Sequence, residues 1–187
     1  MDALELLLGR DSALKLQEPG PGEKDLDVIF KSALRAPDHG RLRPWRFIVI
    51  ANDKRERFGD LTAELLRARQ PDATPEMLAR ERAKALRAPV IVVAAARIKP
   101  SDKIPEVEQI ISAGAAAQNI MLAAHALGYG AMWRTGAPAY DPALKQALGL
   151  EPTDAIIGII YLGTRSGGPA PAPARPVPGD FVENWHG

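Results

Sequence analysis

The spacing of apolar residues predicts an alternation of helices and strands, with helices in excess. The region 23–36 carries apolar side chains at intervals of three and four residues: Leu26, Ile29, Phe30, Ala33 and Leu34. This is the period of an amphipathic helix, which we expect to end at Pro37 because proline disfavours helical geometry in the residue before it. The longest predicted helix spans 106–127 and is rich in alanine.

Unbroken apolar runs predict the strands. The valine-rich run 89–96 indicates a central strand that is buried on both faces. Asp2, followed three residues later by Glu5, has the pattern of a helix capping box. Further strands are predicted at 45–51, 131–134 and 155–162, and further helices at 2–8, 53–69, from Pro75 onward and at 141–148. Such an alternation is typical of an α+β or α/β layered domain.

The last part of the chain has a different composition. Residues 166–179 are mostly Pro, Gly and Ala, which cannot build a core and favour an extended arm. Phe181 and Trp185 follow, and we expect them to be buried by an arm that wraps a neighbouring subunit. A frayed terminus is the alternative. The prediction is one domain over 1–165, with 166–187 as an arm that belongs to it.

Composition excludes several classes of protein. The 187 residues contain 24 Lys and Arg against 23 Asp and Glu, so there is no basic surplus for nucleic-acid binding. There is no cysteine, which excludes a disulfide framework and a thiolate nucleophile, and the three histidines lack metal-ligand spacing. The apolar run 110–127 contains Gln118, Asn119 and His125 and is too polar for a membrane span. The acidic start of the chain does not resemble a signal peptide, so we expect a cytoplasmic protein.

Two short segments concentrate polar chemistry. Residues 35–46 contain four arginines together with Asp38 and His39, between a predicted helix and a predicted strand. Loops held between rigid elements carry binding residues, so this loop is predicted to hold an anionic, flat ligand. Near the N-terminus, Arg10 and Ser12 occupy one turn, where a cation, a hydroxyl and free backbone N–H groups can hold a phosphate. A plain surface turn is the alternative.

A third segment, GYGAMWR at 128–134, contains two glycines in a Gly-x-Gly pattern. A dinucleotide-binding fingerprint follows a strand and opens a helix, whereas this segment ends a helix and opens a strand. The pattern therefore argues against a Rossmann fold.

In their order along the chain, the segments 10–12, 35–46 and 128–134 resemble the FMN-dependent nitroreductase family and its YdjA-like subgroup. The resemblance extends from residue 4 to residue 163 and includes RAPD at 35–38 and PW at 44–45. It implies an α+β nitroreductase-like fold, with a central mixed β-sheet surrounded by helices. It also implies a homodimer with two FMN sites at the interface.

The resemblance implies FMN contacts from both subunits. Arg35 and His39 would reach the flavin from the partner subunit, and the remaining contacts would come from Arg10, Asp11, Ser12, Ala131, Met132 and Trp133. Asp11 departs from the family pattern, which has arginine there. Arg165, after the last strand, is a further candidate for the FMN phosphate, with a solvated loop arginine as the alternative. The nicotinamide of NADH or NADPH would lie along the helix at Met121, Leu122, Ala123, Ala124, His125 and Ala126, for which core packing is the alternative.

The implied activity is that of an FMN-dependent NAD(P)H oxidoreductase. Hydride would pass from the reduced nicotinamide to flavin N5 and then to an electron-poor acceptor, a nitroaromatic or a quinone, in a ping-pong cycle. No protein side chain would act as nucleophile, and His39 would bind FMN, gate the acceptor or supply a proton. The alternatives are a flavin dehydrogenase or dehalogenase of the same fold, and a non-catalytic FMN sensor or carrier.

Overall fold

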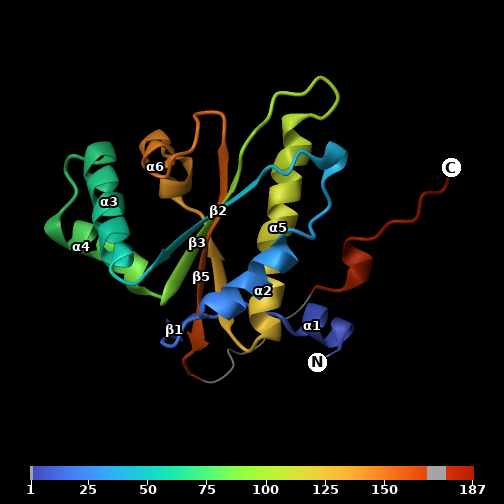
Figure 1. Ribbon diagram of the computed structural model, residues 1–187, viewed down its shortest axis with the longest axis horizontal. Helices are drawn as coiled ribbons and strands as arrows, with labels where there is room; N and C mark the ends of the chain where they lie inside the picture. Colours follow the sequence, from blue (N-terminus) through green and yellow to red (C-terminus); the bar gives the residue numbers. More distant parts are fainter. Residues whose placement is uncertain (1, 168–175) are drawn as a thin grey trace.

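A five-stranded sheet forms the centre of the protein in the computed structural model, which describes residues 2–167 and 176–187 (Figure 1). The strands follow the order β1–β5–β3–β2, and β4 pairs with β5 outside this path. Their bounds are β1 (Leu16–Gln17), β2 (Trp45–Ala51), β3 (Val90–Ala96), β4 (Gly130–Arg134) and β5 (Ala155–Arg165). The predicted strands are confirmed, and β1 was missed because two residues show no alternation.

All four strand pairings among the described residues are antiparallel, so the prediction of a mixed sheet was wrong. The reason lies in β5. Strands β3 and β4 both run opposite to β5 and are joined through a helix, as parallel neighbours usually are. Because β5 lies between them, neither strand has a parallel neighbour.

Helices cover both faces of the sheet. Their bounds are α1 (Ala3–Gly9), α2 (Glu23–Ala33), α3 (Lys54–Arg69), α4 (Pro75–Ala83), α5 (Glu106–Ala126) and α6 (Pro142–Ala147). Helices α2 and α5 pack on one side, and α3, α4 and α6 lie on the other (Figure 1). Strand β3 is buried throughout, with Ile91 and Val93 in one core and Val92 and Ala94 in the other. This confirms the α+β fold class.

Local signals placed the helix ends closely. The Asp2 carboxylate accepts from the N–H groups of Leu4 and Glu5, and the Glu5 carboxylate accepts from the Asp2 N–H, as a capping box requires. Helix α2 ends at Ala33, three residues before the predicted end at 36, because the residues that lead to Pro37 form tighter turns. Strand β5 extends to Arg165, three residues beyond the predicted strand, because the two residues of β1 pair with its last part.

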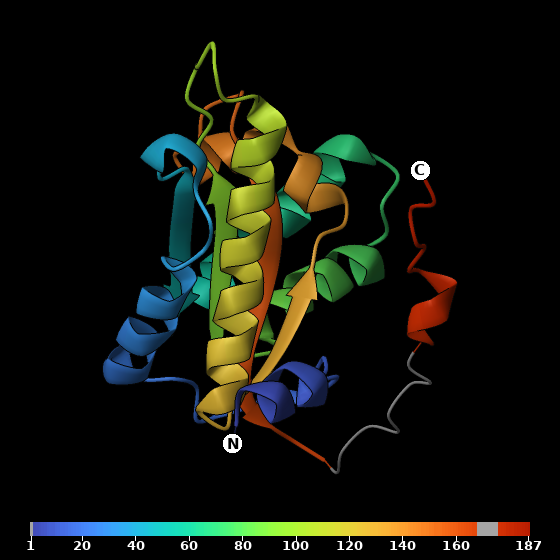
Figure 2. The same ribbon diagram turned by 90° about the vertical axis from the view of Figure 1, so that its right-hand side faces the viewer.

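The C-terminal segment lies away from the body of the domain (Figure 2). Part of the predicted arm, residues 168–175, falls outside the described residues. Beyond it, Phe181 is 75% exposed and Trp185 is 92% exposed. No helix in the described part of the chain combines the length and the apolar character that crossing a membrane requires.

Candidate functional site

The turn after α1 is tied to the end of β5 by an ion pair. The Arg165 guanidinium donates to both carboxylate oxygens of Asp11, with an Nη1–Oδ2 distance of 2.9 Å. The hydrogen bond from Arg165 holds the pKa of Asp11 below its ordinary value, and the same bond raises the pKa of Arg165. Arg165 therefore neutralises Asp11, which the prediction of a phosphate contact at Arg165 did not foresee.

Arg10, in the same turn, is left without such a partner. Its Nη1 atom is buried and has no hydrogen-bond acceptor among the described residues. A buried donor without an acceptor is costly, and an ionised one more so. A phosphate oxygen would satisfy it with a charge-assisted hydrogen bond. The turn therefore fits the phosphate of FMN, because Arg165 offsets Asp11 and Arg10 remains available.

Strand β4 is attached directly to this turn. The Ala13 N–H donates to the Ala131 carbonyl at 2.9 Å. A side chain at Gly130 could not be accommodated, because its Cβ would lie 2.6 Å from Leu16 Cδ2 and 2.9 Å from Ala13 Cβ. Two segments more than 110 residues apart in the sequence thus form one continuous surface.

Side chains of β4 alternate between the two faces of the sheet. Ala131 and Trp133 pack in the core under α5, and the Trp133 indole N–H donates to the Ile157 carbonyl at 3.2 Å. Met132 and Arg134 point to the opposite face, and the Arg134 Nε lies 3.0 Å from the Met132 sulfur. A flavin on that face would meet the Met132 side chain, whereas Ala131 and Trp133 offer it their backbone.

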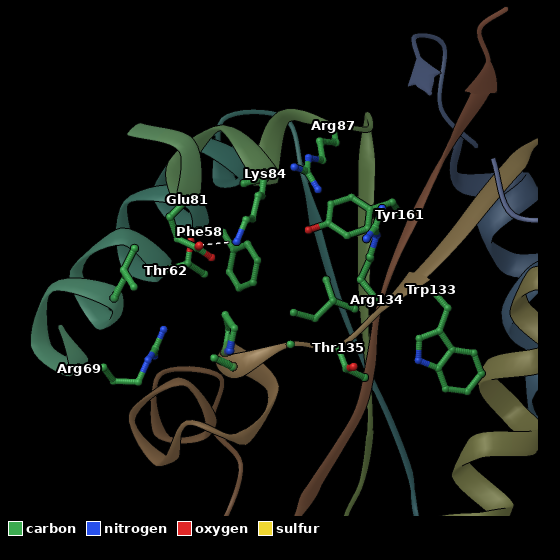
Figure 3. Close-up of a pocket in the computed structure, with 16 residues that line it drawn as sticks. Phe58, Thr62, Arg69, Glu81, Lys84, Arg87, Trp133, Arg134, Thr135 and Tyr161 are labelled. Carbon is green, nitrogen blue, oxygen red and sulfur yellow. Dashed lines mark hydrogen bonds and ion pairs between the residues drawn. The ribbon is translucent and has the colours of Figure 1, made fainter. Parts of the chain in front are cut away.

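Two adjoining cavities open on this face. The first, of about 540 Å³, lies between the N-terminal turn and β4 and includes Lys15, Met132 and Ser166 in its lining. The second, of about 470 Å³, lies between β4 and the helices α3 and α4 (Figure 3). Both are lined by the same three side chains, Arg87, Arg134 and Tyr161.

The shared wall is cationic. Within the described residues, neither Arg87 nor Arg134 forms an ion pair, whereas Lys84 in the second cavity is paired with Glu81. Burial raises the pKa of the Tyr161 hydroxyl, so this group is a neutral hydrogen-bond donor near neutral pH. The two arginines can therefore attract an anion, and the neutral Tyr161 hydroxyl can donate a hydrogen bond to it.

The arginine loop lies at the other end of α5. His39 Nδ1 is 2.6 Å from the Glu108 carboxylate, near the first turn of that helix. The loop is anchored by Ser112, which accepts from the Trp45 indole N–H at 2.9 Å and donates to the Pro37 carbonyl at 2.6 Å. Trp45 thus fixes the loop through its indole N–H and packs against the core between α2, α5 and the sheet. A third cavity, of about 600 Å³, is lined by this loop.

The structure therefore divides the predicted flavin residues into two groups. The residues 10–12, 131–133 and Arg165 lie together, beside the C-terminal end of α5, where a Cβ on Gly9 would be 3.8 Å from His125 Nε2. Arg35 and His39 lie in the loop at the other end. From Glu108 to His125 the helix rises by about 25 Å. One chain alone does not bring the two groups together.

The predicted nicotinamide residues differ in burial. Met121 and Ala124 are buried in the core between α2, α5 and the sheet, whereas Leu122, Ala123 and His125 are partly buried and Ala126 is exposed. Sequence reasoning did not assign a role to Arg87, Arg134 or Tyr161. Arg134 is the last residue of the segment 128–134, which is a usable signal, whereas Arg87 and Tyr161 stand 74 residues apart and meet only in the fold.

Comparisons with known proteins identify the family of this chain. The model of the Nitroreductase family matches residues 9–164. A protein of Escherichia coli (strain K12), named "Putative NAD(P)H nitroreductase YdjA", is 40% identical over 164 residues, which are 88% of this chain and 88% of that protein. A Haemophilus influenzae protein named "Putative NAD(P)H nitroreductase" is 38% identical over 165 residues, covering 88% of this chain and 89% of that protein.

Solved structures share the fold. The nitroreductase-like family protein from Bacillus cereus superposes with a TM-score of 0.81 at 22% identity, over 100% of this chain and 97% of that one. A Desulfovibrio desulfuricans structure, described as a "putative nitroreductase in complex with fmn", gives a TM-score of 0.73 at 25% identity, over 98% of each chain. With a family match over most of its length and relatives of about two-fifths identity, this chain belongs to the nitroreductase family.

Proposed function

We propose that this chain is an FMN-dependent NAD(P)H oxidoreductase that reduces an electron-poor acceptor, a nitroaromatic or a quinone, in a ping-pong cycle. The observation that carries the proposal is the buried Nη1 of Arg10, which has no partner among the described residues, in a member of the nitroreductase family. Arg10 lies in the turn that continues into Ala13 and Lys15, which line a cationic cavity. The nicotinamide reductant in this proposal is taken from the names of the relatives, and FMN is taken from the Desulfovibrio structure.

The first cavity is the proposed flavin site. Arg10 and Ser12 would hold the phosphate, with the Ala13–Ala131 hydrogen bond fixing their position against β4. Lys15 and Arg134 would place positive charge beside the ring system, where it favours an electron-rich flavin. When bound, FMN supplies the redox chemistry by accepting hydride at N5 and passing it on.

The second cavity is the proposed acceptor site. It adjoins the first through Arg87, Arg134 and Tyr161 (Figure 3), so an acceptor bound there would lie next to the proposed flavin position. The Tyr161 hydroxyl would donate a hydrogen bond to the acceptor, and Phe58 and Ile159 give the lining apolar surface. The proposed chemistry requires no protein nucleophile.

The complete site requires two copies of the chain. Arg35 and His39 lie about 25 Å along α5 from the turn that holds Arg10, which fits their supply by the partner subunit. The exposed Phe181 and Trp185 fit a tail that is buried on a partner, with the tail belonging to the same domain. The proposed assembly is thus a homodimer with two FMN sites, in the cytoplasm.

The test is the visible spectrum of the purified protein after incubation with FMN, followed by anaerobic addition of NADH and then NADPH. We expect a bound flavin spectrum that bleaches with nucleotide and returns on addition of a nitroaromatic or a quinone. Bound flavin that stays oxidised would favour the sensor or carrier. Absence of flavin binding would overturn the proposal.

A further inference from the structure

Two arginines of the loop between α2 and β2 hold left-handed backbone conformations. The φ angle is 55° at Arg41 and 50° at Arg43, and among the described non-glycine residues only Asn52 shares this sign. Asparagine adopts this conformation readily, whereas a longer side chain such as arginine rarely does. Strained backbone of this kind persists where the surroundings enforce it, and it is concentrated at binding sites.

The surroundings that enforce the strain can be identified. The Asp38 carboxylate accepts from the Arg43 N–H at 2.8 Å, and Lys99 Nζ donates to the Leu42 carbonyl at 2.5 Å. Ser112 holds the start of the loop through the Pro37 carbonyl. The backbone of the two arginines is therefore fixed before any ligand binds, while their side chains stay exposed.

The side chains line the third cavity, of about 600 Å³. Its cations are Arg35, Arg41 and Arg43, and Asp38 is the acid in the lining. Within residues 2–167 and 176–187, none of these three guanidinium groups forms an ion pair. A concave surface with three unpaired arginines and one carboxylate attracts a phosphate, which guanidinium groups bind through paired N–H donors.

Arg35 connects this cavity to the flavin, because the proposed function places Arg35 at the FMN of the partner subunit. A nicotinamide stacked on that flavin extends its phosphates away from the ring system. We propose that Arg41 and Arg43 bind a phosphate group of the pyridine nucleotide, with the 2′-phosphate of NADPH as the group expected there. This inference rests on the proposed function and adds the choice of coenzyme to it.

The choice of the 2′-phosphate follows from charge. It is a monoester that carries close to two negative charges at neutral pH, whereas each phosphate of the pyrophosphate carries one. Two adjacent arginines match a dianion better than a monoanion. The protein is therefore expected to prefer NADPH to NADH.

The test compares the FMN-loaded wild type with Arg41→Gln, Arg43→Gln and the double variant. The kcat/KM values for NADPH and NADH are measured, together with calorimetric affinities for NADP⁺ and NAD⁺. Arg57→Gln is the control, since this arginine lies on α3 and its side chain is 80% exposed. We expect the double variant to lose at least tenfold in kcat/KM for NADPH and in NADP⁺ affinity, and less than twofold for NADH and NAD⁺.

Each other outcome is decisive. Equal losses with both coenzymes, without loss in the control, would keep the phosphate contact and assign it to the pyrophosphate. Unchanged affinities for both nucleotides, or a loss of FMN affinity instead, would overturn the proposal. If neither nucleotide reduces the wild type, the proposed function fails, whereas the NADP⁺ and NAD⁺ affinities still test the arginine pair.

Discussion

Arg165 donates hydrogen bonds to both carboxylate oxygens of Asp11, although the two residues stand 154 positions apart in the sequence. The pair joins the first turn of the chain to the last residue of β5, and it leaves the neighbouring Arg10 as the unpaired cation of the turn. Asp11 thus has a structural role.

Replacing the Asp11 carboxylate should separate its effect on the stability of the fold from its effect on FMN binding. In Asp11→Asn we expect the free energy of unfolding to fall by about 1 kcal/mol, because a two-pronged ion pair with side chains about one-third exposed is lost. FMN affinity should rise about threefold to tenfold, because Arg165 is released and one negative charge is removed near the phosphate. Urea unfolding and quenching of flavin fluorescence measure the two quantities.

Asp27→Asn is the matched control, since Asp27 pairs with Lys31 on the surface of α2 and its side chain is 58% exposed. It should leave FMN affinity unchanged and lower stability by less than half a kcal/mol, about the contribution of an exposed helical pair. Weaker FMN binding in Asp11→Asn would show that the carboxylate supports the flavin site.

The same pair predicts a dependence of stability on pH. The pKa of Asp11 is lowered from 3.8 by Arg165, so its stabilising contribution is present above the unfolded pKa and is lost as pH falls through the folded one. The gap in unfolding free energy between wild type and Asp11→Asn should stay constant at neutral pH and close below about pH 4. Urea titrations across that range measure it, and a gap of equal size in acid would contradict the assignment.

The sequence predicted the features that depend on neighbouring residues, and it missed those that depend on contacts between residues far apart in the chain. The cap at Asp2 and the strand at 45–51 are local, and both were predicted correctly. The partner of Arg165 is not local, so the sequence predicted a phosphate contact for this residue, with a solvated loop arginine as the alternative, and did not reveal the ion pair. The same limit explains why a mixed sheet was wrongly predicted. The helix between β3 and β4 is visible in the sequence, whereas the insertion of β5 between those strands is a tertiary feature.

The left-handed backbone at Arg43 should lower the stability of the protein. In Arg43→Gly the left-handed backbone becomes unstrained, and we expect the free energy of unfolding to rise by about 0.5–1 kcal/mol after the entropy of the unfolded glycine is included. Arg46→Gly, on the exposed side of β2, should lower it by about 1 kcal/mol, because glycine weakens a strand. Thermal and urea unfolding compare the two variants. A similar loss in both would show that the Arg43 conformation carries no strain.

The anchor of that loop can be tested separately. Ser112→Ala removes the acceptor of the Trp45 indole N–H and the donor to the Pro37 carbonyl, both at a partly buried site. We expect a loss of about 1–3 kcal/mol in unfolding free energy, because both partners are left unsatisfied. Ser32→Ala is the control, since within the described part of the chain its hydroxyl bonds only to the carbonyl of Val28 in its own helix. Equal stability of the two variants in urea would remove Ser112 as the anchor.

The exposed C-terminal tail, residues 176–187, provides a test of the proposed homodimer. Phe181 and Trp185 are 75% and 92% exposed in the single chain, so replacing both with serine costs the isolated subunit little stability. If they are buried on a partner, the double variant loses about 3 kcal/mol or more of association free energy, which weakens the dimer at least a hundredfold. Sedimentation velocity over a concentration series measures this, with Tyr140→Ser as the control because that aromatic ring is equally exposed but lies on the body of the domain. Unchanged self-association in the double variant would show that the tail does not bind the partner. The exposed aromatic residues would then need another explanation, and the interface would have to be sought near the arginine loop alone.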